Sequence, residues 1–269
     1  MGIKSNFNKF LQEKCPQIFE EIHISEYSFK RVAIDISLYL NKYKAIAGEE
    51  NWLSMFIKLI ACLRRNEIHC VFIFDGEAPE EKQGEREKRK AAREKSKEQL
   101  YLLQDALQTY YNTGVIEDCL KEFYEKRKES PKSFLTKQKG IDIKWIENKI
   151  QQKENQQYRI NIEDFEIAKN LFDILKVPYF TAPSEAEKMC SGLCIGGYVD
   201  AALSEDTDIM AYASPVFLKA IHITNDTCIQ IKHESILEGL ELTKEQFLDF
   251  CILCGTDYND NIPKVGSKG

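Results

Sequence analysis

The sequence predicts an α/β protein with a twisted, mostly parallel central sheet, helices on both faces and an inserted helical segment. Short apolar runs alternate along the chain with segments whose apolar residues recur at helical spacing, the pattern of a parallel sheet. A highly charged stretch at about 80–160 interrupts this alternation. We therefore expect a single core over residues 1–269, with a helical insertion at about 80–160.

Four short apolar runs are the predicted strands of this core. They are RVAIDISLYL (31–40), CVFIFD (70–75), VPYFT (177–181) and YVDAAL (198–203). Between them, residues 52–65 and 165–175 carry apolar side chains at helical spacing. Because ligands of parallel α/β sheets bind beyond the carboxyl ends of the strands, acidic residues at those ends are candidate site residues.

The inserted segment is predicted to be helical and basic. Residues 80–99 contain almost no apolar side chain, and an amphipathic helix then follows with Leu100, Leu103 and Leu107 on one face. From 121 to 159 there are eleven Lys or Arg residues and six Asp or Glu residues. Most such runs are solvated helices, and the alternative is a surface that attracts phosphates.

Composition limits the classes of function. The chain has 269 residues, of which 43% are hydrophobic and 30% charged, and no apolar stretch is long enough to span a bilayer. The N-terminus lacks the apolar core of a signal peptide, so we expect an intracellular protein with no membrane partner. A net charge of −6 by itself argues against nucleic acid, unless an acidic cluster offsets a local basic patch.

The nine cysteines include a CxxC at Cys251 and Cys254 and a CxxxC at Cys190 and Cys194. Both pairs lie in apolar, helix-like segments, and no histidine or second pair stands at zinc-ligand spacing. We therefore interpret them as reduced thiols of the core.

Acidic residues gather at strand ends and helix starts, most densely in LSEDTDIM (203–210). Each acid by itself has a structural explanation: Asp35 or Asp75 can cap a helix, and Ser184 to Glu187 has the S-x-x-E pattern of a capping box. Taken together, they supply the oxygen ligands that Mg²⁺ or Mn²⁺ prefers, in numbers that suit two ions acting on a phosphodiester. The sequence has no P-loop, GxSxG or GxGxxG motif.

In these residues the chain resembles the structure-specific 5′ nucleases of the flap endonuclease/XPG type. The resemblance rests on MGI at the N-terminus, VAIDIS around Asp35, VFIFDGEAPEEKQGEREKR (71–89), APSEAEKMC (182–190), ALSEDTDIMAYASP (202–215) and FCILCGTDYNDNIPKVGSK (250–268). It implies a PIN-like 5′ nuclease core whose insertion forms a helical arch. Because Asp75 and Glu185 are 110 residues apart, we expect that arch to be larger than in the smallest flap endonucleases.

The resemblance also implies roles for individual residues. Lys82 and Arg89 match basic residues at the base of the arch that contact the scissile phosphate, and Gly2 matches the family's N-terminal glycine near the active site. Their spacing of seven would put Lys82 and Arg89 two turns apart on one helical face. Without the resemblance, a surface ion pair with Glu85 or Glu87 would be the simpler explanation of both. The implied metal ligands are Asp35, Asp75, Glu185, Glu187, Asp206, Asp208 and Asp257.

The C-terminal stretch, about 245–269, resembles the start of a helix–three-turn–helix motif that grips duplex DNA. The resemblance implies DNA binding, with a K⁺ ion at the turn, through Lys264, Val265, Gly266 and Lys268, although Lys264 stands where the family's turn has glycine. Tyr39 is implied to stack on a base. We expect the chain to continue past residue 269, where a segment that binds a sliding clamp would lie.

The expected activity is Mg²⁺-dependent hydrolysis of DNA at 5′ flaps or free 5′ ends, with two ions, for which Mn²⁺ can substitute, and 5′-phosphate products. The expected location is the nucleus or a viral replication compartment. Three alternatives stay open: a 5′→3′ exonuclease or junction resolvase with the same core, a non-catalytic DNA-binding scaffold, and a nucleotide-sugar transferase using the DxD at Asp206 and Asp208. The last leaves the remaining acids unexplained.

Overall fold

The computed structural model describes residues 2–4, 6–126, 141–157 and 160–259. The chain forms two compact units. The first comprises residues 1–43, 52–85 and 160–269, and the second comprises residues 44–51 and 86–159.

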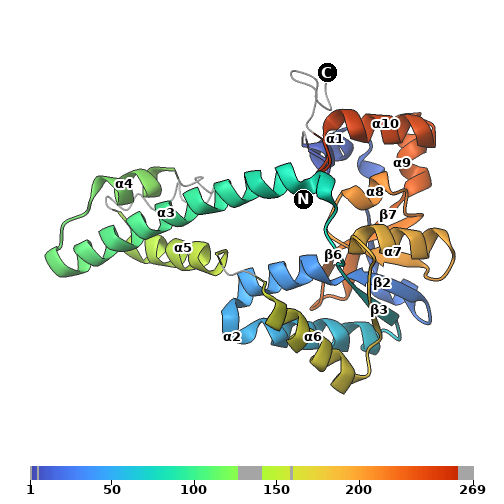
Figure 1. Ribbon diagram of the computed structural model, residues 1–269, viewed down its shortest axis with the longest axis horizontal. Helices are drawn as coiled ribbons and strands as arrows, with labels where there is room; N and C mark the ends of the chain where they lie inside the picture. Colours follow the sequence, from blue (N-terminus) through green and yellow to red (C-terminus); the bar gives the residue numbers. More distant parts are fainter. Residues whose placement is uncertain (1, 5, 127–140, 158–159, 260–269) are drawn as a thin grey trace. The chain divides into compact units, whose positions relative to one another are not determined.

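The first unit is built on one sheet (Figure 1), which in the described residues has seven strands in the order β1-β7-β6-β5-β2-β3-β4. The five strands from β6 to β4 are mutually parallel, and β7 is antiparallel to both β6 and β1. The prediction of a mostly parallel sheet is confirmed. The strands are β1 (Glu20–His23), β2 (Arg31–Asp35), β3 (His69–Phe74), β4 (Tyr179–Thr181), β5 (Ala201–Leu203), β6 (Val216–His222) and β7 (Thr227–Lys232).

Strands β1, β6 and β7 were not among the predicted strands. β6 and β7 form an antiparallel hairpin that adds to the β5 edge of the sheet, with an irregular register between Lys219 and His222. Because only part of each strand is buried, local pattern does not reveal β6 and β7, which are defined by pairing: β6 with β5 and β7, and β7 with β6 and β1.

Helices cover both faces of the sheet, as predicted. Alternate residues of β2 point to opposite faces: Val32 and Ile34 belong to one core with α2 and α6, whereas Ala33 belongs to another with α1, α7 and α10. The helices and 3₁₀ turns of this unit are α1 (Phe7–Lys14), η1 (Pro16–Ile18), η2 (Ile24–Tyr27), α2 (Ile36–Arg65), η3 (Glu80–Lys82), α6 (Ile162–Leu175), α7 (Ala186–Ile195), α8 (Asp208–Ala211), α9 (His233–Leu240) and α10 (Lys244–Cys254).

The strand order reverses between β2 and β5. From β2 the chain adds β3 and then β4 on one side, whereas β5 pairs with the other side of β2 and is followed outward by β6. A crevice is therefore expected beyond the carboxyl ends of the adjacent parallel strands β2 and β5, the place where α/β sheets bind their ligands. Asp35 ends β2, and the acidic segment 204–208 follows β5.

Two local expectations about helix starts had different outcomes. Asp35 caps α2, because its Oδ1 accepts the Ser37 N–H at 3.0 Å. The predicted capping box from Ser184 to Glu187 is wrong, since α7 begins at Ala186 and its N-cap makes no side-chain hydrogen bond. Instead the Asp75 carboxylate accepts the Ala186 N–H at 2.8 Å, which ties the end of β3 to the start of α7.

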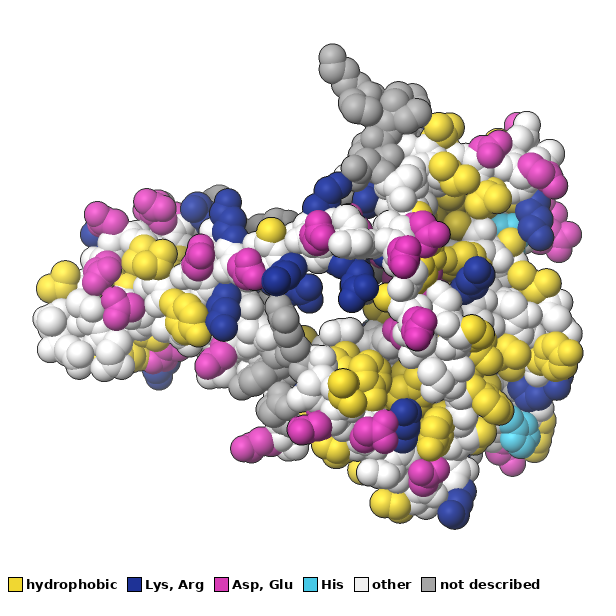
Figure 2. Space-filling view, viewed as in Figure 1, with side chains coloured by type: hydrophobic (Ala, Val, Ile, Leu, Met, Phe, Trp, Pro, Cys, Tyr) yellow, Lys and Arg dark blue, Asp and Glu magenta, His cyan; other side chains and the backbone are white. Residues whose placement is uncertain are grey.

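The second unit contains α3 from residue 86 onward (the helix as a whole is Gln83–Thr113), α4 (Asp118–Glu125) and α5 (Ile143–Asn155). Leu100 and Leu103 are buried against Leu120, Ile146 and α5 in a small core, as the amphipathic spacing predicted. Before Leu100 the helix is almost entirely exposed. Figure 2 shows side chains of both charges, with apolar ones between them, on this unit.

The cysteines of the core are reduced thiols. All nine are free, and Cys190, Cys194, Cys251 and Cys254 are buried, so the interpretation of these pairs is confirmed. Across the described ranges, no helix combines the length and apolarity needed to cross a bilayer.

Candidate active site

Acidic side chains from separate segments meet at the switch point of the sheet. Asp35 comes from the end of β2, Asp75 from the end of β3, and Asp206 and Asp208 from the segment after β5. All but the exposed Asp75 are buried, with between 2% and 5% of the residue exposed. Buried carboxylates are costly unless they are paired, hydrogen-bonded or bound to a metal.

The turn after β5 orients its acids through short hydrogen bonds. Ser204 Oγ donates to Asp35 Oδ2 at 3.2 Å and accepts the Asp206 N–H at 3.1 Å. Asp206 Oδ1 in turn accepts the Asp208 N–H at 3.0 Å. Both oxygens of Asp208 are buried, yet neither has a hydrogen-bond partner among the described residues. A buried carboxylate without hydrogen-bond donors around it is suited to binding a cation.

Glu205, in the same segment, has a different role. Its carboxylate pairs with Lys42 at 2.8 Å and accepts the Ala220 N–H at 3.2 Å. It therefore stabilises the start of α2 against β6 and stands apart from the buried acids.

A second acidic group surrounds the ammonium of Lys82. This nitrogen contacts Glu185 Oε1 and lies 3.7 Å from Glu187 Oε1 and 3.8 Å from Asp257 Oδ2. All four side chains are about nine-tenths buried. Burial opposes the charge on Lys82, but the hydrogen bond to Glu185 and the charge of Glu187 outweigh it, so the pKa of Lys82 is raised.

Two tyrosines that sequence reasoning missed hold Glu185. The hydroxyls of Tyr212 and Tyr258 both donate to Glu185 Oε2, the first at 3.0 Å. They lie 3.2 Å from each other, and the Tyr258 ring lies 4.6 Å from the Lys82 nitrogen. No sequence signal marks Tyr212 beyond its place in the 202–215 block, because only folding brings α8 beside Glu185.

Burial and neighbouring charges raise the pKa values of Asp35, Glu187 and Asp208. Burial, followed by the charge of Asp75, raises the pKa of Asp35 to about 7. Burial, followed by the charges of Asp35 and Glu185, raises the pKa of Glu187 to about 9. Burial and the charge of Asp206 raise the pKa of Asp208 to about 7.

The charge of Asp257 acts on both Asp206 and Asp208. All seven acids are thus electrostatic neighbours, and together they favour a cation.

The donor set suits a hard divalent cation. The cluster offers carboxylate oxygens and no imidazole, the chemistry of Mg²⁺ or Mn²⁺ rather than zinc. Within the described residues, no three Asp, Glu, His or Cys side chains converge into a ready-made metal cage. Two features fit such an ion: the Asp208 oxygens, which no described residue hydrogen-bonds, and the mutual repulsion of Asp206 and Asp208.

The backbone of Gly2 packs directly on the Asp206 turn. Its φ of 92° is a conformation that favours glycine, and a Cβ there would overlap Asp206 Oδ1 and come within 2.7 Å of Asp208 N. The next residue, Ile3, donates its N–H to Thr207 Oγ1 at 2.9 Å. Gly2 therefore lies at the acidic turn, as the resemblance implied.

Lys82 and Arg89 do not share an α-helix. Lys82 lies in the 3₁₀ turn η3, just before α3 begins, whereas Arg89 lies in the second unit on α3. The predicted helical spacing is wrong for Lys82, because Pro79 starts a tighter turn that ends at Lys82.

Two further sequence predictions concern residues outside this cluster. The predicted stacking of Tyr39 on a base is wrong, because Tyr39 is fully buried and packs on Tyr43, with ring centroids 5.6 Å apart. The predicted DNA-binding residues Lys264, Val265, Gly266 and Lys268 lie outside the described residues.

Comparison with known proteins gives matches along the whole chain. The family model of the XPG N-terminal domain matches residues 1–96, and that of the XPG I-region matches residues 176–257. The probable RAD2-like endonuclease 369L of Invertebrate iridescent virus 6 is 33% identical over 288 positions, covering 99% of this chain and 69% of that protein. Flap endonuclease 1 of Debaryomyces hansenii is 31% identical, covering 99% of this chain and 64% of that protein.

The fold is also that of a solved nuclease core. The catalytic core of Rad2 in complex with DNA substrate superposes with a TM-score of 0.64 at 19% identity, covering 96% of this chain and 64% of that one. The chain thus spans about two thirds of the length of these relatives. With both family models matching and a third of its residues shared with a RAD2-like endonuclease, the chain belongs to the XPG family, the family that the sequence motifs indicated.

Proposed function

We propose that this chain is the catalytic part of a divalent-metal-dependent nuclease that cuts DNA at 5′ flaps or free 5′ ends and leaves 5′ phosphates. The observation that carries the proposal is the cluster of buried acids at the switch point, where both Asp208 oxygens lack a hydrogen-bond partner within the part of the chain that the structure describes. The names of its relatives, RAD2-like endonuclease and flap endonuclease 1, favour the same class of reaction.

The acids would hold two ions of Mg²⁺ or Mn²⁺. Asp35, Asp75, Asp206 and Asp208 at the strand ends, with Glu185, Glu187 and Asp257 around Lys82, are the proposed ligands. When bound, such ions lower the pKa of a coordinated water and offset charge on the leaving oxygen.

The remaining groups position the site and its substrate. Tyr212 and Tyr258 fix the orientation of Glu185 through hydrogen bonds to one oxygen. The Lys82 ammonium carries three hydrogens, so it can hold Glu185 and still donate to a scissile phosphate. Arg89 is the second proposed phosphate contact. The reacting nucleotide would leave the base stack to reach the acids, at a cost of a few kcal/mol.

The test uses two neighbouring acids as variant and control. Asp206→Asn keeps the shape of a side chain that we assign to the site, whereas Glu205→Gln removes an acid that pairs with Lys42. On a 5′-labelled flap duplex at saturating Mg²⁺, we expect Asp206→Asn to lose at least about a hundredfold in cleavage rate, a scale typical of lost electrostatic stabilisation, and Glu205→Gln to stay within a few fold of the original chain.

Equal activity of Asp206→Asn and the original chain would refute the metal role. Nicked, blunt and four-way substrates in the same assay define the preferred DNA structure. Failure of calorimetry to detect millimolar Mg²⁺ or Mn²⁺ binding would favour a non-catalytic scaffold instead.

A further inference from the structure

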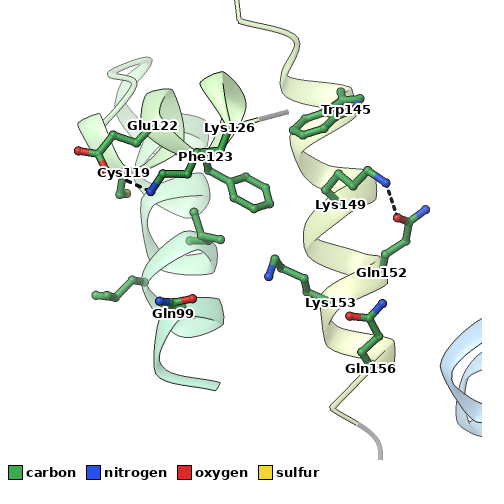
Figure 3. A pocket seen from close by; sticks show the side chains of 12 residues that line it. Gln99, Cys119, Glu122, Phe123, Lys126, Trp145, Lys149, Gln152, Lys153 and Gln156 are labelled. Atoms are coloured by element: carbon green, nitrogen blue, oxygen red, sulfur yellow. Dashed lines mark hydrogen bonds and ion pairs between the residues drawn. The ribbon is translucent and has the colours of Figure 1, made fainter. Parts of the chain in front are cut away.

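The lysines of this chain make contacts of two kinds. Some join neighbours on one helix, as Lys149 does in Figure 3, where its ammonium donates to Gln152 one turn further along α5. A contact of that kind cannot fix one part of the chain against another. Lys4 makes the other kind, because its ammonium contacts Glu85 and Asn259, which are both distant from it in the sequence.

Lys4 holds the turn that carries Asp257. Its backbone N–H donates to the Gly255 carbonyl at 2.8 Å, and its ammonium donates to the Asn259 carbonyl at 3.3 Å. These two contacts lie on either side of Asp257 in the sequence. The turn is also closed internally, because Thr256 Oγ1 donates to Asn259 Oδ1 at 2.7 Å. Lys4 is therefore bonded to both ends of one compact turn.

The same ammonium reaches the base of α3. It lies 3.2 Å from Glu85 Oε2, and the two side chains are 27% and 19% exposed. Glu85 lies in the first turn of α3, directly after the 3₁₀ turn η3 that ends at Lys82. Lys4 thus joins the segment that carries Lys82 to the turn that carries Asp257.

Together with the contacts of Lys82, these contacts form a closed circuit. The Lys82 ammonium lies 3.8 Å from Asp257 Oδ2 and 4.6 Å from the centre of the Tyr258 ring. Lys82 and Lys4 therefore hold the same turn at different points, and Glu85 links Lys4 back to the segment of Lys82. Two segments that are joined at two points keep one relative orientation, whereas a single contact would let them pivot.

We propose that Lys4 is a positioning residue of the candidate active site, which fixes the turn of Asp257 against the segment of Lys82. Its effect on cleavage rests on the proposed function, whereas the fixing of the two segments does not. A half-exposed ion pair contributes little to stability, but displacing a group at the reacting centre by about 1 Å can cost about a hundredfold in rate. The role of Lys4 should therefore appear in the rate of cleavage more than in the Tm.

Hydrogen exchange in EDTA measures the fixing of the two segments without any cleavage. Lys4→Met keeps most of the aliphatic side chain and removes the ammonium. We expect amide exchange to become at least about threefold faster in both 80–85 and 255–259, because local opening of each segment loses one restraint. The control Lys9→Met removes an exposed i,i+4 pair with Glu13 on α1 and should leave exchange in both segments unchanged.

Flap cleavage in saturating Mg²⁺ measures the consequence for the reaction. In Lys4→Met we expect kcat to fall about tenfold with an unchanged KM, while the Tm stays within about 3 °C of that of the original chain. Lys4→Arg keeps donors for both partners, so its kcat should stay within about threefold of the original. The double variant Lys4→Met/Glu85→Gln should be no slower than Lys4→Met, because both changes remove one contact.

Four results would overturn the proposal: unchanged exchange in either segment of Lys4→Met, an equal effect of Lys9→Met, a raised KM with an unchanged kcat, or additive losses of kcat in the double variant. The third would assign Lys4 to substrate binding, and the fourth would show that Lys4 and Glu85 act separately. Absence of cleavage by the unmodified chain would refute the proposed function instead, and hydrogen exchange alone would then decide whether Lys4 fixes the two segments.

Discussion

The buried ammonium of Lys82 provides the most informative perturbation, because it is a cation that contacts several of the acids directly. In Lys82→Met the aliphatic part of the side chain is largely kept while the charge is removed. Glu185 and Asp257 would then lose this counter-charge within one buried region. The variant therefore measures how strongly these acids need a cation.

The magnitude follows from the distances. At 3.8 Å the pair with Asp257 contributes about 4 kcal/mol of gross attraction at an effective dielectric constant of about 20, most of which offsets desolvation. Removing one partner of a buried ion pair costs about 3–5 kcal/mol of the free energy of unfolding. For a chain of this size, that corresponds to a fall in Tm of about 6–20 °C.

The assay is thermal unfolding in EDTA and in saturating Mg²⁺. We expect the Tm of Lys82→Met in EDTA to lie at least 6 °C below that of the original chain, the low end of about 6–20 °C. Adding Mg²⁺ should raise the Tm of Lys82→Met by more than it raises the Tm of the original chain. If the native acids bind divalent ions as proposed, these ions would no longer compete with an ammonium. The control is Lys121→Met, which removes an exposed i,i+3 pair with Asp118 and should change stability by less than about 1 kcal/mol.

Two outcomes would refute the reasoning. A loss in EDTA no larger than that of Lys121→Met would show that the ammonium does not neutralise the acids. A loss that Mg²⁺ leaves unchanged would show that the acids around Lys82 do not bind the ion.

Further predictions concern pH, Gly2 and Tyr212. Burial raises the pKa of Glu187 to about 9, so between its ordinary pKa and pH 9 the folded chain binds more protons than the unfolded chain, and the Tm in EDTA should fall as pH rises from 6 to 9. Saturating Mg²⁺ should make this fall in Tm smaller. Equal slopes of Tm against pH with and without Mg²⁺ would contradict the assignment of Glu187 as a metal ligand. Gly2→Ala should lower the rate of flap cleavage at least about tenfold, because a backbone strain of about 1–2 kcal/mol adds to the overlap of the new Cβ with the acidic turn. The control Gly192→Ala lies in α7, where a Cβ would meet open space, and should leave the rate unchanged. Equal cleavage rates of Gly2→Ala and Gly192→Ala would show that the acidic turn tolerates a side chain at Gly2. Tyr212→Phe removes one hydrogen bond to Glu185, worth about 1 kcal/mol, so kcat for flap cleavage should fall about fivefold while KM for the flap substrate stays unchanged. A changed KM with an unchanged kcat would instead assign Tyr212 to substrate binding.

The sequence by itself determined the fold class and the family. Apolar runs alternating with helical periodicity predicted a mostly parallel sheet covered on both faces, and the structure confirms it through the opposite orientations of Ala33 and Ile34 on β2. The ordered motif blocks predicted the XPG family, which the comparisons confirm. These features are visible in the sequence because each depends on local periodicity or on residue identity.

Tertiary structure decided which neighbours each acid has. Glu205 and Asp206 are adjacent and chemically alike, yet one pairs with Lys42 on α2 and the other turns inward beneath Gly2. The ammonium of Lys82 reaches Glu185 and Asp257 across more than a hundred residues, and the hydroxyl of Tyr212 reaches Glu185 from the turn after α8. Spacing along a chain carries no information about such contacts, because they arise only when the folded chain brings together segments that are distant in the sequence.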